Sequence, residues 1–323
     1  MKYLITGGAG FIGSHLAERL LADGHEVAVL DNLSTGSADN LKPILMHPRF
    51  KFVLGSVESS LDLGSLMAWA DTVFHLAAAV GVDLVVTQPV HTIHTNIHAT
   101  EKVLDYAVKT GTKVMLASTS EVYGKAASDM FRETDDLLLG SPVHFRWSYA
   151  ASKALDEYLA MAYRKERNLK VVITRFFNTV GPRQSGAHGM VVPRFVQQAM
   201  RGESLRVFGD GEQIRCFCHV LDTVEALVRL DQNPKAMGEI FNIGTSTPVT
   251  ILQLAEQVNS LVGNSAGIVR IPYSEAYAPG FEDMMRRIPD TTKLRNLTGW
   301  APIRDLDEII GEVKTYFQDK PQA

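Results

Sequence analysis

The sequence opens with a strand-like apolar run that leads directly into a glycine-rich turn, Lys2-Tyr3-Leu4-Ile5-Thr6-Gly7-Gly8-Ala9-Gly10-Phe11-Ile12-Gly13, and a helical pattern follows over residues 14–21. Gly7 permits a tight turn, and Gly10 lets a pyrophosphate approach the backbone. Gly13 lets the helix pack close to the strand while its amino end faces the anion. The order of strand, glycine turn and helix therefore predicts a dinucleotide site.

A second strand-like run, residues 26–30, ends at Asp31. A carboxylate at this place accepts hydrogen bonds from the ribose hydroxyls of the adenosine. It would also repel a 2′-phosphate, and the next residues are Asn32, Leu33 and Ser34 rather than arginine. We therefore predict NAD as the cofactor rather than NADP. No Gly-Lys-Ser/Thr follows the glycines, which argues against an NTPase.

Strand-like and helix-like segments alternate up to about residue 176, which predicts an α/β fold with a doubly wound parallel (Rossmann) sheet. The rhythm then breaks, so we expect a smaller, interleaved α/β lobe. We expect one domain over 1–177 plus about 236–262, and the lobe over 178–235 and 263–318. The predicted strands are 2–6, 26–30, 50–54, 72–75, 112–117, 170–175 and 239–243, and the predicted helices are 12–23, 61–69, 90–109 and 148–168.

Length and composition fit a globular chain with a large core. It has 323 residues, of which 46% are hydrophobic, and a net charge of −4. This charge gives no reason to expect nucleic acid or an anionic membrane as a partner. We recognise no signal peptide and no apolar run long enough to span a bilayer, so we expect a cytoplasmic protein.

Two groups of residues raise the question of a metal site. Cys216 and Cys218 lie two apart in a strand-like run, which favours small buried residues in a reducing compartment over a metal pair with His219. His91, His94 and His98 fall roughly on one helical face, but no HExxH signature or neighbouring acid completes a site. We therefore predict no metal, with zinc as the alternative.

Tyr149 and Lys153 stand at i, i+4 in Ser148-Tyr149-Ala150-Ala151-Ser152-Lys153. On a helix this spacing puts the phenol and the ammonium on one face. A lysine that close favours the phenolate, so we expect it to lower the tyrosine pKa towards neutrality, as a general base requires. The alternative is a surface pair with a solvated lysine.

These motifs in this order resemble the extended short-chain dehydrogenases/reductases, the NAD-dependent epimerase/dehydratase family. The resemblance runs from Lys2 to about Phe317 and includes His75-Leu76-Ala77-Ala78, residues 118–124, Tyr149 with Lys153, and Arg175-Phe176-Phe177-Asn178. One departure is Ser56, which replaces the aspartate that these enzymes usually offer to the adenine. The resemblance implies that Tyr149 removes a proton from a sugar 4-hydroxyl while a hydride moves from C4 to NAD. It further implies that Thr119 contacts the same oxygen and that Lys153 also holds the nicotinamide ribose. The implied cofactor contacts are Gly7, Gly10, Phe11, Ile12, Gly13, Asp31, Asn32, Leu76, Ala77, Asn96, Tyr149 and Lys153.

The step that follows oxidation is predicted from Ser120, Glu121 and Arg287. Epimerases of the family usually carry a small residue where this chain has Glu121, whereas the pattern here resembles the UDP-glucuronate decarboxylases. In that resemblance Glu121 and Arg287 flank the reacting carbons. Arg287 is expected to hold the substrate carboxylate and stabilise an enolate, or else to bind the diphosphate. Glu121 is expected either to be protonated or to destabilise the bound carboxylate.

We therefore predict decarboxylation of UDP-glucuronate to UDP-xylose or its 4-keto pentose through a 4-keto intermediate. The first alternative is a UDP-hexose or UDP-uronate 4-epimerase, and the second is a dinucleotide-binding sensor without turnover. By resemblance we expect a homodimer paired through the helices 90–109 and 148–168. The expected UDP-sugar contacts are Ser120, Asn178, Val192, Phe195, Phe208, Arg215 and Arg287.

Overall fold

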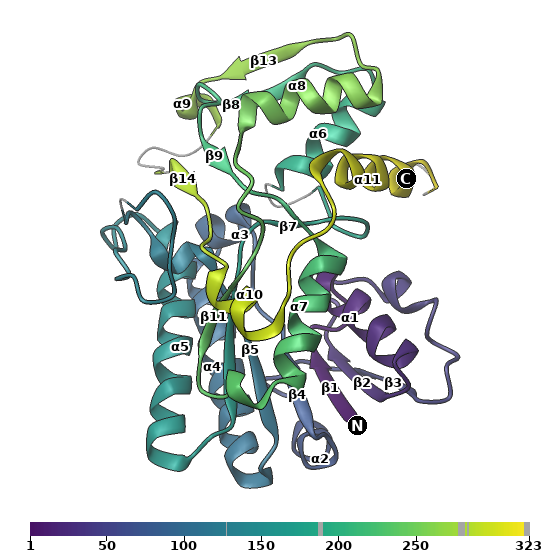
Figure 1. The fold of residues 1–323 in the computed structure, drawn as a ribbon, viewed down its shortest axis with the longest axis vertical. Helices are drawn as coiled ribbons and strands as arrows, with labels where there is room; N and C mark the ends of the chain where they lie inside the picture. Colours follow the sequence, from purple (N-terminus) through teal and green to yellow (C-terminus); the bar gives the residue numbers. More distant parts are fainter. Residues whose placement is uncertain (127, 187–189, 277–281, 283, 320–323) are drawn as a thin grey trace.

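The computed structural model describes residues 1–126, 128–186, 190–276, 282 and 284–319. Its central element is a seven-stranded parallel sheet in the order β11-β6-β5-β4-β1-β2-β3 (Figure 1). The strand order reverses between β1 and β4, the place where open α/β sheets bind ligands. This confirms the predicted doubly wound sheet, with strand ends shifted by at most two residues. The strands are β1 Lys2–Thr6, β2 Glu26–Asp31, β3 Phe50–Leu54, β4 Thr72–His75, β5 Lys113–Thr119, β6 Val171–Phe176 and β11 Ile240–Ile243.

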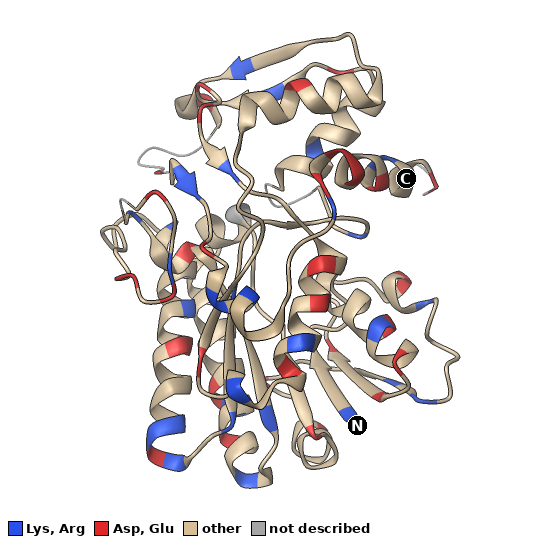
Figure 2. Cartoon of the chain, viewed as in Figure 1, with Lys and Arg blue, Asp and Glu red and all other residues tan. Residues whose placement is uncertain are grey.

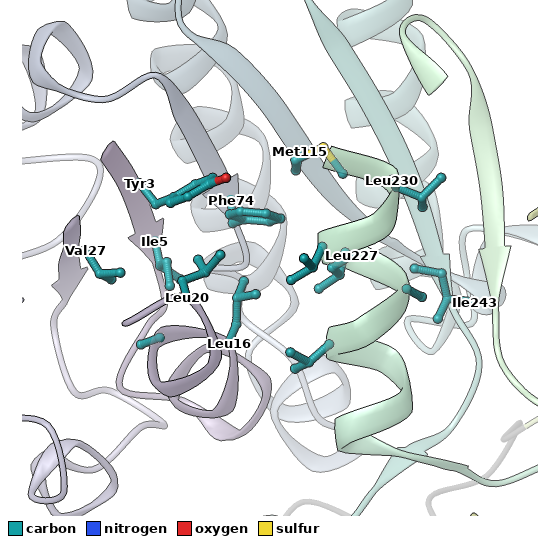
Figure 3. Close-up of a cluster of buried hydrophobic side chains, with 14 of the residues drawn as sticks. Tyr3, Ile5, Leu16, Leu20, Val27, Phe74, Met115, Leu227, Leu230 and Ile243 are labelled. Atoms are coloured by element: carbon teal, nitrogen blue, oxygen red, sulfur yellow. The ribbon is translucent and has the colours of Figure 1, made fainter. Parts of the chain in front are cut away.

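Helices cover both faces of the sheet, because its strands are apolar on both sides. On one face, α1 (Phe11–Ala22) and α7 (Val220–Gln232) pack their leucines against the strands, as Figure 3 shows for Leu16, Leu20 and Leu227. On the other face lie α2 (Leu63–Trp69), α4 (Pro89–Thr110) and α5 (Trp147–Arg167). None of the helices in the described part of the chain combines the length and the apolar run that a bilayer crossing needs.

A smaller lobe has its own hydrophobic core at one end of the sheet (Figure 1). Three helices form it, α6 (Val191–Met200), α8 (Ile251–Val262) and α11 (Leu306–Gln318), beside the parallel strand pair β8 (Leu205–Phe208) and β13 (Ile268–Ile271).

The packing of two helices differs from the expected division into 1–177 with 236–262 and 178–235 with 263–318. Helix α7 falls in the segment expected to build the lobe, but Val224, Leu227 and Leu230 belong to the core under the sheet. Helix α8 falls in the segment expected to join the sheet, but Leu254 and Val258 belong to the core of the lobe. Periodicity predicts that a helix has an apolar face, and it does not specify which layer that face meets. The domain boundaries therefore remain a prediction.

Short strands connect the lobe to the carboxyl ends of the main strands. Strand β9 (Ile214–Arg215) lies between β12 (Val249–Thr250) and β14 (Arg286–Arg287), while β7 (Thr179–Val180) pairs with β10 (Cys218–His219). This arrangement brings residues from distant parts of the sequence to the edge of the sheet where Tyr149 lies.

Candidate active site

The turn between β1 and α1 has the geometry that the glycine pattern predicted. Gly7 has a φ of 72°, and a Cβ built on it would lie 2.7 Å from the Ala77 backbone nitrogen. A Cβ on Gly13 would lie 2.4 Å from the Gly7 carbonyl oxygen. Side chains are thus excluded at both places, and the amino end of α1 opens at Gly10, its N-cap. Phe11 and Ile12 form the first turn of the helix.

Asp31 ends β2 beside this turn. Its Oδ2 accepts a hydrogen bond from the Ala9 amide at 2.9 Å, and its Oδ1 accepts one from the Leu33 amide at 2.7 Å. Burial raises the pKa of Asp31, and the two amides oppose that effect. Each oxygen retains a lone pair for a ribose hydroxyl. Asn32 caps its own turn by accepting from the Ser34 amide at 3.0 Å.

Leu76 and Ala77 follow β4 and face the same turn. The Leu76 amide donates to the Thr6 carbonyl at 3.1 Å, which fixes this loop against β1. Asn96, whose cofactor contact remains a prediction, also bonds to other parts of the protein. It is buried, its Oδ1 accepts from the Ala79 amide at 2.8 Å, and its Nδ2 donates to Ser152 Oγ at 3.1 Å. Asn96 therefore ties the loop after β4 to α5.

Tyr149 and Lys153 lie in the first turns of α5, as predicted. A buried ion pair joins this helix to β6: Arg175 Nη2 lies 2.7 Å from Glu157 Oε2, and both side chains are about 5% exposed or less. Arg175, which belongs to one of the family motifs in the sequence, thus fixes α5, the helix that carries Tyr149, against the sheet. Thr119, at the end of β5, lies beside the Tyr149 hydroxyl.

The expected lowering of the tyrosine pKa is wrong for this arrangement. Burial is the largest effect and raises the Tyr149 pKa, and the negative charges of Glu121 and Asp156 raise it further. Lys153 directs its Nζ to Asp156 Oδ2 at 2.8 Å, an acid three residues along the helix. Spacing alone predicted the nearness of the lysine but not this neutralising partner.

Glu121 lies at the centre of a charged cluster next to Tyr149. Its Oε1 accepts from Arg287 Nη1 at 2.7 Å, and its Oε2 pairs with Arg146 Nη1. Arg287 also donates through Nη2 to Ser120 Oγ at 2.8 Å. Burial raises the pKa of Glu121, but the charges of Arg146 and Arg287 outweigh it and lower the value to about 2. Glu121 is therefore an ionised carboxylate here.

Arg146 is a member of this cluster that the sequence analysis did not predict as a site residue. Only 9% of its side chain is exposed. Its Nε donates to the Glu282 carbonyl at 2.7 Å, and its guanidinium lies 4.8 Å from the centre of the Trp147 ring. The sequence feature that could have identified Arg146 is its position three residues before Tyr149, at the N-cap of α5.

Arg215 and Arg287 are direct neighbours on the paired strands β9 and β14. Figure 2 shows blue, the colour of Lys and Arg, on both strands. Arg215 also lowers the pKa of Glu121. Nearby, Asn178 uses Nδ2 to donate to the Cys216 carbonyl at 3.0 Å. The predicted arginines thus come together, and with Arg146 they form a mostly buried group around Glu121. Guanidinium groups are suited to a ligand with several negative charges.

Among the apolar residues predicted to contact the UDP-sugar, where they would line the pocket for the nucleotide base, two belong to the core of the lobe. Val192 is 1% exposed and Phe195 is fully buried, so their expected role in lining a base pocket is not supported. Phe208 is half-buried, and the Arg194 guanidinium lies 4.2 Å from the centre of its ring. Its role as a contact remains a prediction.

Cys216 and Cys218 are both buried and free. Burial raises the pKa of each thiol to about 12, which fits small core residues better than metal ligands. Across the described ranges, no group of three or more His, Cys, Asp and Glu side chains has the arrangement to hold a metal ion. His94 and His98 instead stack edge to face with their ring centres 5.2 Å apart.

Comparison with known proteins identifies the family. The model of the family described as GDP-mannose 4,6 dehydratase matches residues 4–313. The chain belongs to this family. It is 39% identical over 98% of both chains to the UDP-N-acetyl-alpha-D-glucosaminuronate decarboxylase of Bacillus cytotoxicus. It is also 35% identical to UDP-glucuronic acid decarboxylase 1 of Danio rerio, over 98% of this chain and 72% of the relative.

Solved structures of two UDP-sugar epimerases have the same fold. The UDP-glucuronic acid 4-epimerase of Bacillus cereus, in complex with UDP-glucuronic acid and NAD, superimposes with a TM-score of 0.89 and 28% identity over 98% of this chain and 99% of the other. The UDP-glucose 4-epimerase of Thermotoga maritima, with UDP-glucose, gives 0.88 and 31% over the same shares. Family membership confirms the resemblance to extended short-chain dehydrogenases/reductases. The glycine turn, which side chains would obstruct, and the carboxylate of Asp31 fit NAD.

Proposed function

We propose that this protein is an NAD-dependent decarboxylase of a UDP-uronate, most simply UDP-glucuronate. The observation that carries the proposal is the ionised Glu121 held between Arg146 and Arg287 beside Tyr149. An epimerase needs only to let the oxidised sugar turn over and take the hydride back on its other face, a step that requires no group to leave the sugar. A decarboxylase must also bind and release a carboxylate, for which paired guanidinium groups are suited.

The chemistry follows from the groups on the chain. NAD, when bound, supplies the hydride acceptor for C4 of the sugar. Tyr149 takes the proton of the C4 hydroxyl in its phenolate form, and Thr119 orients that oxygen. Because burial and the neighbouring acids raise the Tyr149 pKa, the phenol must lose its own proton before this step. The product is a β-keto acid, so the bond between C5 and the carboxylate carbon breaks and carbon dioxide leaves, while the electron pair moves into the enolate of the C4 ketone. Arg287 stabilises that negative charge, and C5 then takes a proton from solvent, which gives the 4-keto pentose.

The ionisation of Glu121 favours one of its two predicted roles. A carboxylate with a pKa of about 2 is not a proton donor at neutral pH. Its negative charge next to the substrate carboxylate instead favours departure of that group as neutral carbon dioxide. Glu121 also competes with the substrate carboxylate for the two arginines, which weakens ground-state binding.

The group at C2 of the sugar is a separate question. The decarboxylase of Bacillus cytotoxicus is named for an N-acetylated uronate, and the one of Danio rerio for glucuronate. Both named substrates carry the uronate carboxylate, the group that we propose the arginines around Glu121 bind. Both UDP-uronates therefore belong in the first assay.

The second candidate is a UDP-uronate or UDP-hexose 4-epimerase. It is supported by the close superposition on the Bacillus cereus and Thermotoga maritima epimerases. Incubating the protein with NAD and each UDP-uronate, and following products by NMR, separates the two functions. Carbon dioxide with a UDP-pentose supports the decarboxylase, whereas a C4 epimer without carbon dioxide overturns it and assigns Arg287 to the diphosphate.

We further propose a cytoplasmic homodimer. Large apolar side chains are exposed on the neighbouring helices α4 and α5: Val90 at 68%, Leu155 at 49% and Tyr158 at 68%. Burying them against a second copy removes apolar surface from water. Light scattering is expected to give twice the chain mass, and Tyr158→Glu with Leu155→Glu is expected to give monomers.

A further inference from the structure

Lys153 and Asp156 form an ion pair inside the protein, at the base of the candidate active site. Lys153 Nζ lies 2.8 Å from Asp156 Oδ2, and the two side chains are 4% and 1% exposed. They stand three residues apart on α5, so the helix itself holds them together. The second oxygen, Oδ1, is buried and accepts no hydrogen bond from the described residues. Within the described residues, the ion-pair partner of this carboxylate is therefore the lysine expected to assist Tyr149, and the Thr100 hydroxyl lies beside it.

We propose that Asp156 is a positioning residue that fixes where the Lys153 ammonium lies and how much of its positive charge reaches the Tyr149 hydroxyl. A lysine near a phenol favours the phenolate, but an adjacent carboxylate offsets that charge. Asp156 thus makes the base of this enzyme hold its proton more tightly than a tyrosine beside an uncompensated lysine. The effect of Asp156 on turnover rests on the proposed function. Its effect on the ionisation of the Tyr149 phenol does not.

Other charged groups face the same site and set the background for this effect. Glu121 raises the Tyr149 pKa and Arg287 lowers it, whereas Asp156 raises it from the tyrosine's own helix. His75, from β4, stays neutral, because burial and the Lys153 charge lower its pKa to about 3. The remaining groups beside Asp156 are Thr100 on α4 and Glu157 on α5, of which Glu157 pairs with Arg175.

The test replaces the carboxylate with its neutral isostere, Asp156→Asn, and restores it with Asp156→Glu. Ultraviolet absorbance at one alkaline pH reports phenolate, and subtracting the same protein with Tyr149→Phe isolates Tyr149. Asp156→Asn is expected to carry about tenfold more Tyr149 phenolate than the parent, a shift of about one pH unit to lower pH. The acidic side of the pH profile of kcat for the UDP-uronate is expected to shift to lower pH as well. Asp156→Glu is expected to return both the phenolate fraction and the kcat profile towards those of the parent.

Asp105→Asn is the matched control, because Asp105 Oδ1 accepts a hydrogen bond from the Tyr163 hydroxyl at 2.7 Å near the surface. It is expected to leave the kcat profile unchanged. Circular dichroism and NAD titration establish that each variant is folded and binds cofactor. If folded Asp156→Asn has an unchanged or higher Tyr149 pKa, the proposal is overturned. If the parent protein turns over no UDP-uronate, the proposed function is contradicted instead. The phenolate measurement still decides the role of Asp156.

Discussion

The charged cluster at Glu121 illustrates how single residues acquire their chemistry from partners that are distant in sequence. Arg287 comes from the lobe and Arg146 from the lead-in to α5, and both bond to the same carboxylate. Without them, burial would raise the pKa of Glu121; with them, the pKa is about 2. The ionic form is the consequence of the fold.

Replacing Glu121 with Gln removes the charge and keeps the shape. We expect carbon dioxide release to fall by about 10²-fold, a size typical of losing one electrostatic group at a reacting centre. NAD affinity is expected to stay within about twofold, since Glu121 lies outside the glycine turn. Isothermal titration with NAD beside a turnover assay checks both. Unchanged turnover would remove Glu121 from the mechanism.

Replacing Arg146 with Gln leaves Glu121 with one close arginine. We expect a loss of about 2 kcal/mol in the free energy of unfolding, typical of a hydrogen bond between charged groups. A carboxylate with a lowered pKa contributes stability above its unfolded pKa and loses it as pH falls through the folded value, so the loss is expected in full at neutral pH and to shrink in acid. Urea titrations at several pH values measure it.

The control for Arg146 is Lys125→Gln. Lys125 pairs with Glu282 in the same region but does not bond to Glu121. A neutral-pH loss as large in Lys125→Gln as in Arg146→Gln would mean that the link to Glu282, rather than the charge on Glu121, accounts for the effect.

Helices and strands were the most predictable part of this chain. Each predicted strand of the sheet is present because apolar runs, glycine turns and amphipathic helices are local signals. The packing of α7 and α8 was not predictable, since both have an apolar face and only the folded topology decides which core receives it. Likewise, the motif identified Tyr149 and Lys153, while the pairing of Lys153 with Asp156 depends on burial that spacing does not reveal.

The join between β1 and α1 gives a test of that local reasoning. In Gly13→Ala the new methyl group would lie 2.4 Å from a backbone oxygen and 2.7 Å from Gly8 Cα, so α1 must shift. We expect a loss of NAD binding and of about 1–3 kcal/mol in the free energy of unfolding. Gly311→Ala is the control on the exposed face of α11, where a Cβ meets nothing within 4 Å, and it is expected to stabilise by about 0.5–1 kcal/mol. Equal effects of the two substitutions would contradict the close approach.

Across the chain, the two lobes contribute different parts of one site. The sheet and its helices supply the glycine turn, Asp31 and, from α5, Tyr149. The short strands β9 and β14 supply Arg215 and Arg287. We therefore expect NAD to stabilise the protein by about 2.7 kcal/mol at a concentration of one hundred times its Kd. UDP is expected to stabilise the protein further through the arginines. Arg215→Gln is expected to reduce the stabilisation by UDP but not the stabilisation by NAD. Thermal unfolding with each ligand alone and with both measures this.

The central claim is that Tyr149 starts an oxidation whose product loses its carboxylate. The most direct measurement supplies UDP-glucuronate, and separately its 2-acetamido counterpart, labelled with carbon-13 in the carboxylate, to the protein with NAD. We expect the label of one of these uronates to appear as carbon dioxide or bicarbonate, and Tyr149→Phe to abolish its release while the protein stays folded and still binds NAD. Label that remains in the sugar, for both uronates, contradicts the account.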